Sequence, residues 1–215
     1  MTQLSLSQQA YLSIKQQIVS LRLPPGSVIN EAELREELNL SRTPIREALQ
    51  RLAQEKLILI VPRRGMFVTE ISITDLQKLF EARLALEPFV ARLAAQRGTV
   101  QHWSKMDDVL ATAPPHDEEA DNEKLIAIDE ACHQIVYEAA ANQFLCDTLR
   151  TLYALSLRLW YFSLNQIGNM QDAVLEHQLI LDALRLKDED EAARLMETHI
   201  HTFHKELQIV IGGKI

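Results

Sequence analysis

The stretch Ser41-Arg42-Thr43-Pro44-Ile45-Arg46-Glu47-Ala48-Leu49 decides how the N-terminal part of this chain folds. Thr43 followed by Pro44 predicts a helix start, because threonine is a good N-cap residue and proline is tolerated in the first turn. The predicted helix runs to about residue 56, with an inner face formed by Ile45, Ala48, Leu49 and Leu52. Arg42 and Arg46 share a face if both lie within this helix, and Arg42 extends beside it if it precedes the cap.

The flanking segments complete a helix-turn-helix pattern followed by a hairpin. Apolar residues with helical spacing predict a helix at 7–21, which Pro24-Pro25-Gly26 ends. Asn30 is the predicted N-cap of a helix over 31–38, and residues 39–41 break the chain briefly. Two β-prone runs, 57–61 and 66–69, surround a predicted turn at 62–65. Two helices joined by a short turn are suited to DNA, with the second helix entering the major groove.

The predicted DNA-contacting positions carry basic or hydroxyl side chains at the helix start, and two arginines and a glycine at the hairpin tip. Arginine binds guanine and phosphate well, and hydroxyl groups at a helix N-terminus donate to phosphates. A basic hairpin tip suits the minor groove or the backbone. The predicted residues are Ser41, Arg42, Thr43, Arg46, Arg63, Arg64 and Gly65. The alternative interpretation is an ordinary helical hairpin with exposed arginines.

Charge is unevenly divided along the chain. The 215 residues have a net charge of −8, but residues 1–70 contain 9 Lys and Arg against 7 Asp and Glu, and the remainder contains 13 against 23. A locally basic segment on an acidic protein indicates one surface for a polyanion, although a solvated helix face gives the same pattern.

From residue 72 onward the pattern is helical almost throughout. The whole chain has only 6 Gly and 7 Pro, which argues against an all-β fold. Predicted helices lie at 75–96, 100–111, 122–141, 143–167, 172–186 and 188–210, with a loop at 113–119. The predicted fold is therefore mostly α, with a winged helix-turn-helix domain over 1–71 and an all-helical bundle over 72–215. No membrane span, secretory signal or disulfide framework is visible, so we expect a cytoplasmic protein with no membrane contact.

Histidines and one aspartate form a candidate metal site in the predicted bundle. Asp129 and His133 are spaced i, i+4 and point to one side of their helix, whereas His177 and His199 lie on two other predicted helices. Three imidazoles and a carboxylate form a donor set for Zn²⁺ or a similar divalent ion, if the bundle brings them together. A surface ion pair between Asp129 and His133, with packed or exposed histidines elsewhere, is the alternative.

Arg83 is a candidate anion-binding residue on the first helix of the bundle. It lies on a largely apolar face, where an arginine needs an anion, and a carboxylate is its natural bidentate partner. That carboxylate belongs either to a bound ligand or to Glu87, four residues further along the chain.

Two resemblances sharpen these interpretations. The segments at 26–31 and 41–49, with the hairpin Arg64-Gly65-Met66-Phe67-Val68, resemble the winged helix-turn-helix of GntR-type transcriptional regulators. In that family, residues matching Arg42, Thr43 and Arg46 contact operator DNA, and the wing glycine reaches the minor groove. The resemblance covers about residues 7–71.

The second part is similar to the FCD ligand-binding domain of the FadR-like branch of these regulators. The similarity covers about residues 75–208 and rests on Arg83 with Glu87, Asp129 with His133, Glu176 with His177, and His199. It implies a metal site at Asp129, His133, His177 and His199, with zinc expected and nickel or manganese as alternatives. It further implies that Arg83 holds the carboxylate of a small organic acid effector.

Three classes of function follow from these features. The leading hypothesis is a non-enzymatic, metabolite-responsive regulator that binds double-stranded operator DNA as a homodimer, because two half-sites need two recognition helices. The resemblance implies a repressor, although the residues themselves do not give the sign of regulation. The alternatives are a metal-dependent hydrolase that uses the Asp/His site, and a helical scaffold without a ligand.

Overall fold

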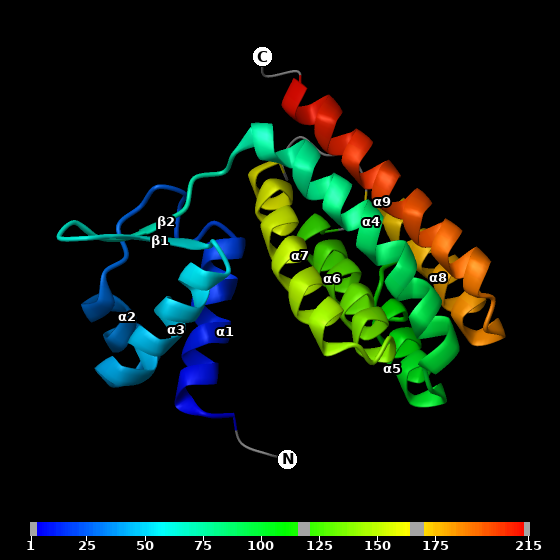
Figure 1. The fold of residues 1–215 in the computed structure, drawn as a ribbon, viewed down its shortest axis with the longest axis horizontal. Coiled ribbons are helices and arrows are strands. Elements are labelled where there is room, and N and C mark those ends of the chain that lie inside the picture. Colours follow the sequence, from blue (N-terminus) through cyan, green and yellow to red (C-terminus); the bar gives the residue numbers. More distant parts are fainter. Residues whose placement is uncertain (1–3, 116–120, 164–169, 213–215) are drawn as a thin grey trace. The chain divides into compact units, whose positions relative to one another are not determined.

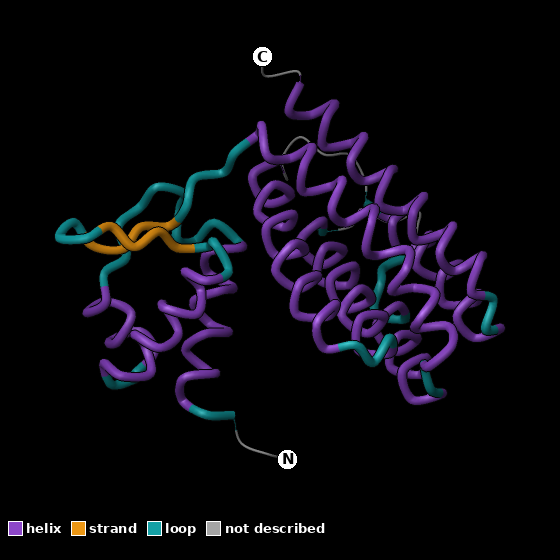
Figure 2. Tube along the Cα trace, in the orientation of Figure 1, coloured by secondary structure: helices purple, strands orange, loops and turns teal. Residues whose placement is uncertain are grey.

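The computed structural model describes residues 4–115, 121–163 and 170–212. Within these ranges the chain forms nine α-helices and one two-stranded sheet (Figure 1). It divides into two compact units, one made of residues up to 72 together with 154–162, and the other of 73–153 together with the residues from 163 onward. Helices dominate the trace in Figure 2, so the predicted mostly α fold class is confirmed.

The N-terminal part of the first unit is a winged helix-turn-helix. Its elements are α1 (Leu6–Val19), α2 (Glu31–Leu38), α3 (Arg42–Gln54), β1 (Ile58–Val61) and β2 (Gly65–Val68). The strands are antiparallel, with Ile58 opposite Val68 and Val61 opposite Gly65. The predicted order of helix, helix, turn, helix and hairpin is confirmed.

The apolar face of α3 fixes the direction in which its polar face points. Ile45, Leu49 and Leu52 are fully buried in a core that they share with Ile14 and Ile18 of α1. Burial of such side chains contributes about 1.5–3 kcal/mol each, so the helix is held firmly in this orientation. The opposite face of α3, which begins with its basic residues, remains exposed to solvent.

Helix α3 begins two residues earlier than the sequence predicts. Ser41 is the N-cap residue, with an extended backbone at φ −72° and ψ 170°. Pro44 is therefore the third helical residue, where its missing N–H matters little because first-turn amides have no intrahelical acceptor. The prediction that Thr43 caps the helix is wrong. As a result, Arg42 and Arg46 both lie inside α3, one turn apart.

The remaining helices agree closely with those predicted. They are α4 (Ile73–Arg97), α5 (Val100–Leu110), α6 (Asn122–Ala139), α7 (Gln143–Ser163), α8 (Gln171–Leu186) and α9 (Glu189–Gly212). The predicted continuation of α7 to residue 167 and the predicted loop residues 116–119 lie outside the described residues. None of the described helices is both long and apolar enough to span a lipid bilayer.

The second unit is a helical bundle with polar groups at its centre. Helix α9 lies along α4, α8 contacts both of them, and α6 contacts α4 and α8 (Figure 1). These four helices bury charged or titratable side chains, which folded proteins seldom bury without partners. The most deeply buried of these residues are Arg83 and Glu87 on α4, Asp129 and His133 on α6, His177 on α8, and His199 on α9.

Candidate metal centre and DNA-binding surface

The bundle brings all four predicted metal ligands together. Asp129 and His133 lie one turn apart on α6, and they face His177 on α8 and His199 on α9. One donor atom from each residue can be chosen so that all four lie within 4.8 Å of one another. Each of the four side chains is at most 4% exposed, so the group is shielded from bulk water.

Each of the three imidazoles is anchored through its Nδ1 nitrogen. His177 and His199 donate from Nδ1 to the Ala173 carbonyl oxygen at 2.8 Å and to Glu176 Oε2 at 2.7 Å, whereas His133 Nδ1 lies 2.9 Å from Glu87 Oε2 as an ion-pair contact. An oxygen acceptor places the proton of a neutral imidazole on Nδ1, which leaves the lone pair on Nε2. Acceptors of this kind fix ring orientation in metal-binding histidines.

The Nε2 atoms of His133 and His199 lie near the aspartate, and His177 approaches Asp129 Oδ1 through Nδ1 at 3.6 Å. His199 Nε2 lies 3.2 Å from His133 Nε2 and 3.3 Å from Asp129 Oδ1. Neither Asp129 Oδ1 nor His177 Nε2 has a hydrogen-bond partner among the described residues, although both atoms are buried. Buried polar atoms are costly to leave unpaired. Nitrogen and oxygen atoms gathered in this way form a binding site for a cation, either a proton or a metal ion.

Electrostatics in the centre favour a positive charge. Burial raises the pKa of Asp129, but the surrounding imidazoles outweigh burial and hold this pKa well below its usual range. Burial and the neighbouring His199 lower the pKa of His177 to about 3, so its imidazole is neutral at pH 7. Burial also lowers the pKa of His199, but the neighbouring carboxylates of Asp129 and Glu176 outweigh burial and raise the pKa to about 9, so this imidazole is protonated at pH 7. A cation, whether a proton or a metal ion, is thus attracted to the space between these groups.

Arg83 is linked to this centre through one carboxylate. Its guanidinium is 2% exposed and forms an ion pair with Glu87, whose other oxygen contacts His133. The rings of Phe80, Tyr153 and Phe203 lie 5.0–5.5 Å from the guanidinium carbon. Arg83 Nη1 is buried and has no hydrogen-bond partner within the described ranges. The pairing with Glu87 that the spacing allowed is therefore present, and it still leaves one donor nitrogen unused.

Residue spacing in the sequence does not identify three further residues of the candidate metal centre. Tyr153 on α7 donates a hydrogen bond to Asp129 Oδ2, Glu176 accepts one from His199, and Glu87 lies in ion-pair contact with His133. Burial keeps the pKa of Tyr153 well above its usual value, so the phenol remains a donor. The only available hint is that Glu87 follows Arg83 at a one-turn spacing and that Glu176 directly precedes His177.

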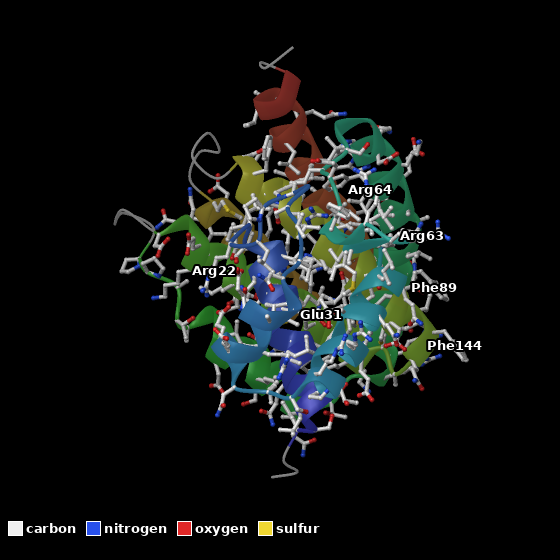
Figure 3. The ribbon with its side chains drawn as sticks, turned by 90° about the vertical axis from the view of Figure 1, so that its left-hand side faces the viewer. Arg22, Glu31, Arg63, Arg64, Phe89 and Phe144 are labelled. Carbon is white, nitrogen blue, oxygen red and sulfur yellow. The ribbon has the colours of Figure 1, made fainter. Side chains whose placement is uncertain are left out.

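The seven predicted DNA-contacting residues lie on exposed parts of the winged helix-turn-helix. Ser41, Arg42, Thr43 and Arg46 occupy the first turns of α3 or its cap, and all are exposed. Arg63 and Arg64, both labelled in Figure 3, lie in the turn between β1 and β2, and Gly65 is the first residue of β2. Gly65 has a positive φ of 111°, and a Cβ at this position meets no atom within 4 Å. The wing tip is therefore open on the side that a nucleic acid can approach.

Glu31 is an additional residue of this surface that the sequence does not single out. It begins α2, and its carboxylate accepts from Arg46 Nε at 3.1 Å and lies 3.7 Å from Arg42 Nε. Glu31 and Arg46 are 15 positions apart in the chain, so they meet only because the helix-turn-helix places the start of α2 beside the start of α3.

Two family models match successive parts of the chain. The family model described as "FCD domain" matches residues 78–202, and the model "Bacterial regulatory proteins, gntR family" matches residues 6–68. The HTH-type transcriptional repressor RspR of Escherichia coli is 29% identical over 203 residues, which cover 94% of this chain and 89% of RspR. The Nta operon transcriptional regulator of Aminobacter aminovorans is 30% identical, with 92% of each chain covered.

A solved structure supports the fold of the whole chain. The structure of E. coli McbR/YncC has a TM-score of 0.85 and 22% identity, and the match covers 99% of this chain and 100% of that one. The family and its relatives are transcription regulators, which overturns the hydrolase and scaffold hypotheses. The chain belongs to the gntR family of bacterial regulatory proteins and carries an FCD domain after its helix-turn-helix.

Proposed function

We propose that this regulator is a metal-dependent sensor of a small organic acid, and that its homodimer represses transcription in the cytoplasm until the acid binds. The observation that carries the proposal is the convergence of Asp129, His133, His177 and His199, with two buried donor atoms left unpaired. Because operator binding and effector binding are linked, each must weaken the other by the same factor.

Zinc is the ion that we propose for the centre, with nickel or manganese as alternatives. Three imidazoles and one carboxylate suit borderline divalent ions better than Ca²⁺ or Mg²⁺, which prefer oxygen ligands. Bonds of about 2.0–2.1 Å in a tetrahedron place ligand atoms about 3.3 Å apart. The separations of 3.2 and 3.3 Å around His199 Nε2 are close to this value. The bound ion would neutralise the centre, and an effector oxygen would bind it as a fifth ligand by expansion of the tetrahedron.

Metal analysis tests the centre directly. Protein purified without a polyhistidine tag is expected to carry about one divalent ion per chain after dialysis, as measured by mass spectrometry of the metal content. His177→Ala is expected to lose the ion. His201→Ala is the matched control, because His201 is exposed on α9 and outside the ligand group. Retention of the metal in His177→Ala would refute the proposed ligand set.

Arg83 is the residue that we propose for the effector carboxylate. A buried guanidinium with a free Nη1 can donate to a carboxylate oxygen while its other side stays paired with Glu87. A ligand that binds only the native state raises stability by RT ln(1 + [L]/Kd), so a thermal-shift panel of small carboxylic acids reveals it. Arg83→Lys keeps the positive charge and loses the planar guanidinium. This variant is expected to lose most of the rise in melting temperature that the acid causes in the wild type.

The primary amide of each active acid is the matched ligand control for this test. It has nearly the same size but no negative charge, and it should shift the melting temperature of the wild type little. An Arg83→Lys chain that responds to the acid as the wild type does would remove Arg83 from the effector site.

Operator binding is tested with the recognition helix. Arg46→Ala is expected to weaken binding to the chain's own upstream DNA by about 1–3 kcal/mol in a gel-shift titration, if Arg46 contacts a base. Arg194→Ala removes the same charge from α9 and is expected to leave the affinity unchanged. A wild-type chain that forms no complex with this DNA at low salt would contradict the proposal.

A further inference from the structure

The contact between Glu31 and Arg46 has a geometry that leaves the end of the arginine free. Both carboxylate oxygens of Glu31 lie near Arg46 Nε, at 3.3 and 3.1 Å. Among the described residues, neither Nη atom of Arg46 has a partner, and the side chain is 53% exposed. The two Nη groups are the part of a guanidinium that can bind O6 and N7 of guanine together. The carboxylate of Glu31 thus contacts Arg46 at Nε, while the two Nη groups of Arg46 stay available to bind DNA.

Glu31 itself is held in place by the fold. It is the first residue of α2, where a carboxylate is favoured by the helix dipole. The preceding Asn30 caps the helix by accepting from the amides of Ala32 and Glu33, and Leu34 anchors α2 in the core. The Glu31 side chain is only 23% exposed, less than either arginine that it contacts. A fixed carboxylate can therefore orient a flexible arginine.

We propose that Glu31 is a specificity-determining residue, which orients Arg46, and to a lesser degree Arg42, for base contacts and disfavours binding through phosphates alone. Ordering an arginine before binding removes an entropic cost that a correct site would otherwise bear. At the same time, the negative charge repels the phosphate backbone of every sequence. A specific DNA site compensates for this repulsion by binding the oriented guanidinium of Arg46, whereas a non-specific site does not. The ratio of specific to non-specific affinity therefore rises.

The proposal differs from two simpler roles for the same ion pair. If Glu31 only repels DNA, its removal strengthens specific and non-specific binding by the same factor. If it only stabilises the helix-turn-helix, its removal lowers the melting temperature and leaves the ratio of the two affinities unchanged. Surface ion pairs contribute little to stability, so the second role predicts a small effect.

The test measures both affinities for Glu31→Gln in the full-length chain. Selection from a random duplex library with the wild type provides the specific probe, and a shuffled duplex of equal length provides the non-specific one. Glu31→Gln is expected to bind the shuffled duplex more tightly, with a salt slope steeper by up to about 1. Its ratio of specific to non-specific affinity is expected to fall about 10-fold, as for loss of one base contact.

Two further variants make the result decisive. Glu36→Gln removes the same charge from an exposed position of α2 and is expected to keep the wild-type ratio. In an Arg46→Ala background, Glu31→Gln should change the ratio much less than it does in the wild-type background, because the main residue that it orients is gone. A ratio within twofold of the wild type for Glu31→Gln alone would overturn the proposal. The inference rests on operator binding, and a wild type that selects no duplex would reject operator binding itself rather than the role of Glu31.

Discussion

The two functional regions of this chain each hold an arginine with a glutamate, and they do so under opposite conditions. Arg46 and Glu31 meet at the surface, with the arginine 53% exposed, whereas Arg83 and Glu87 meet in the bundle, with the arginine 2% exposed. An exposed pair contributes about 0–1 kcal/mol and exchanges readily with a phosphate or a base. A buried pair cannot exchange with solvent, and loss of either member leaves the other charge without compensation. The surface pair is thus suited to a large polyanion, and the buried pair to a rigid site for a small ligand.

The largest effect that this comparison predicts is on stability. Glu87→Ala is expected to lower the free energy of unfolding by about 3–5 kcal/mol, because it leaves the buried charge of Arg83 unpaired. Glu31→Gln is expected to lower it by no more than about 1 kcal/mol. Urea denaturation of the two variants and the wild type at one pH measures both values. Equal losses of unfolding free energy in the two variants would show that the buried and the exposed ion pair do not differ in this way.

A double variant sharpens the same point. Arg83→Met combined with Glu87→Gln removes both charges and keeps an acceptor for His133 Nδ1. Because a buried pair replaced as a unit leaves no uncompensated charge, this variant is expected to recover most of the stability that Glu87→Ala loses. No recovery would mean that the unpaired charge of Arg83 is not the cause of the loss in Glu87→Ala.

An intermediate effect is expected in the layer around the metal ligands. Glu176→Gln replaces the carboxylate that accepts from His199 Nδ1, and it is expected to weaken zinc binding about 10- to 100-fold. Competition with a chromophoric chelator measures the affinity. Glu197→Gln is the matched control, since Glu197 is an exposed residue of α9 two positions before His199. Equal zinc affinities for Glu176→Gln and the wild type would exclude Glu176 from this role.

The smallest effect is expected at the wing. Arg64→Ala removes one exposed charge from the hairpin tip, and it is expected to weaken binding about equally for specific and shuffled duplexes. The slope of log affinity against log salt should become shallower by about 1. Fluorescence anisotropy over a series of salt concentrations measures this slope. A loss confined to the specific duplex would instead assign Arg64 a base contact.

Local signals in the sequence predict the fold better than they predict helix starts. The apolar spacing in α3 and the cap at Asn30 depend on neighbouring residues only, and the structure confirms them. Ser41 and Thr43 are both acceptable caps, and Pro44 is tolerated at any position of the first turn, so propensity alone does not choose between them. The choice depends on where α3 meets the core.

The candidate metal centre is predictable only in part for a related reason. Its four ligands can be named from residue type and from resemblance, but the carboxylates of Glu87 and Glu176 and the phenol of Tyr153 reach it from three different helices. No periodicity within one helix reveals such contacts. The same limit applies to Glu31, whose partner Arg46 is a neighbour only after the helix-turn-helix has formed.

The anchored imidazoles have a consequence for metal choice in the cell. Because Glu87, Ala173 and Glu176 fix the three rings from behind, the protein itself, rather than an incoming ion, sets the positions of the nitrogen donors. If the proposed metal binding holds, donors positioned in this way would accept zinc, nickel or manganese with little rearrangement, although these ions differ in affinity in a fixed order. The supply of each ion in the cell, more than the geometry of the site, would then decide which of them the regulator carries.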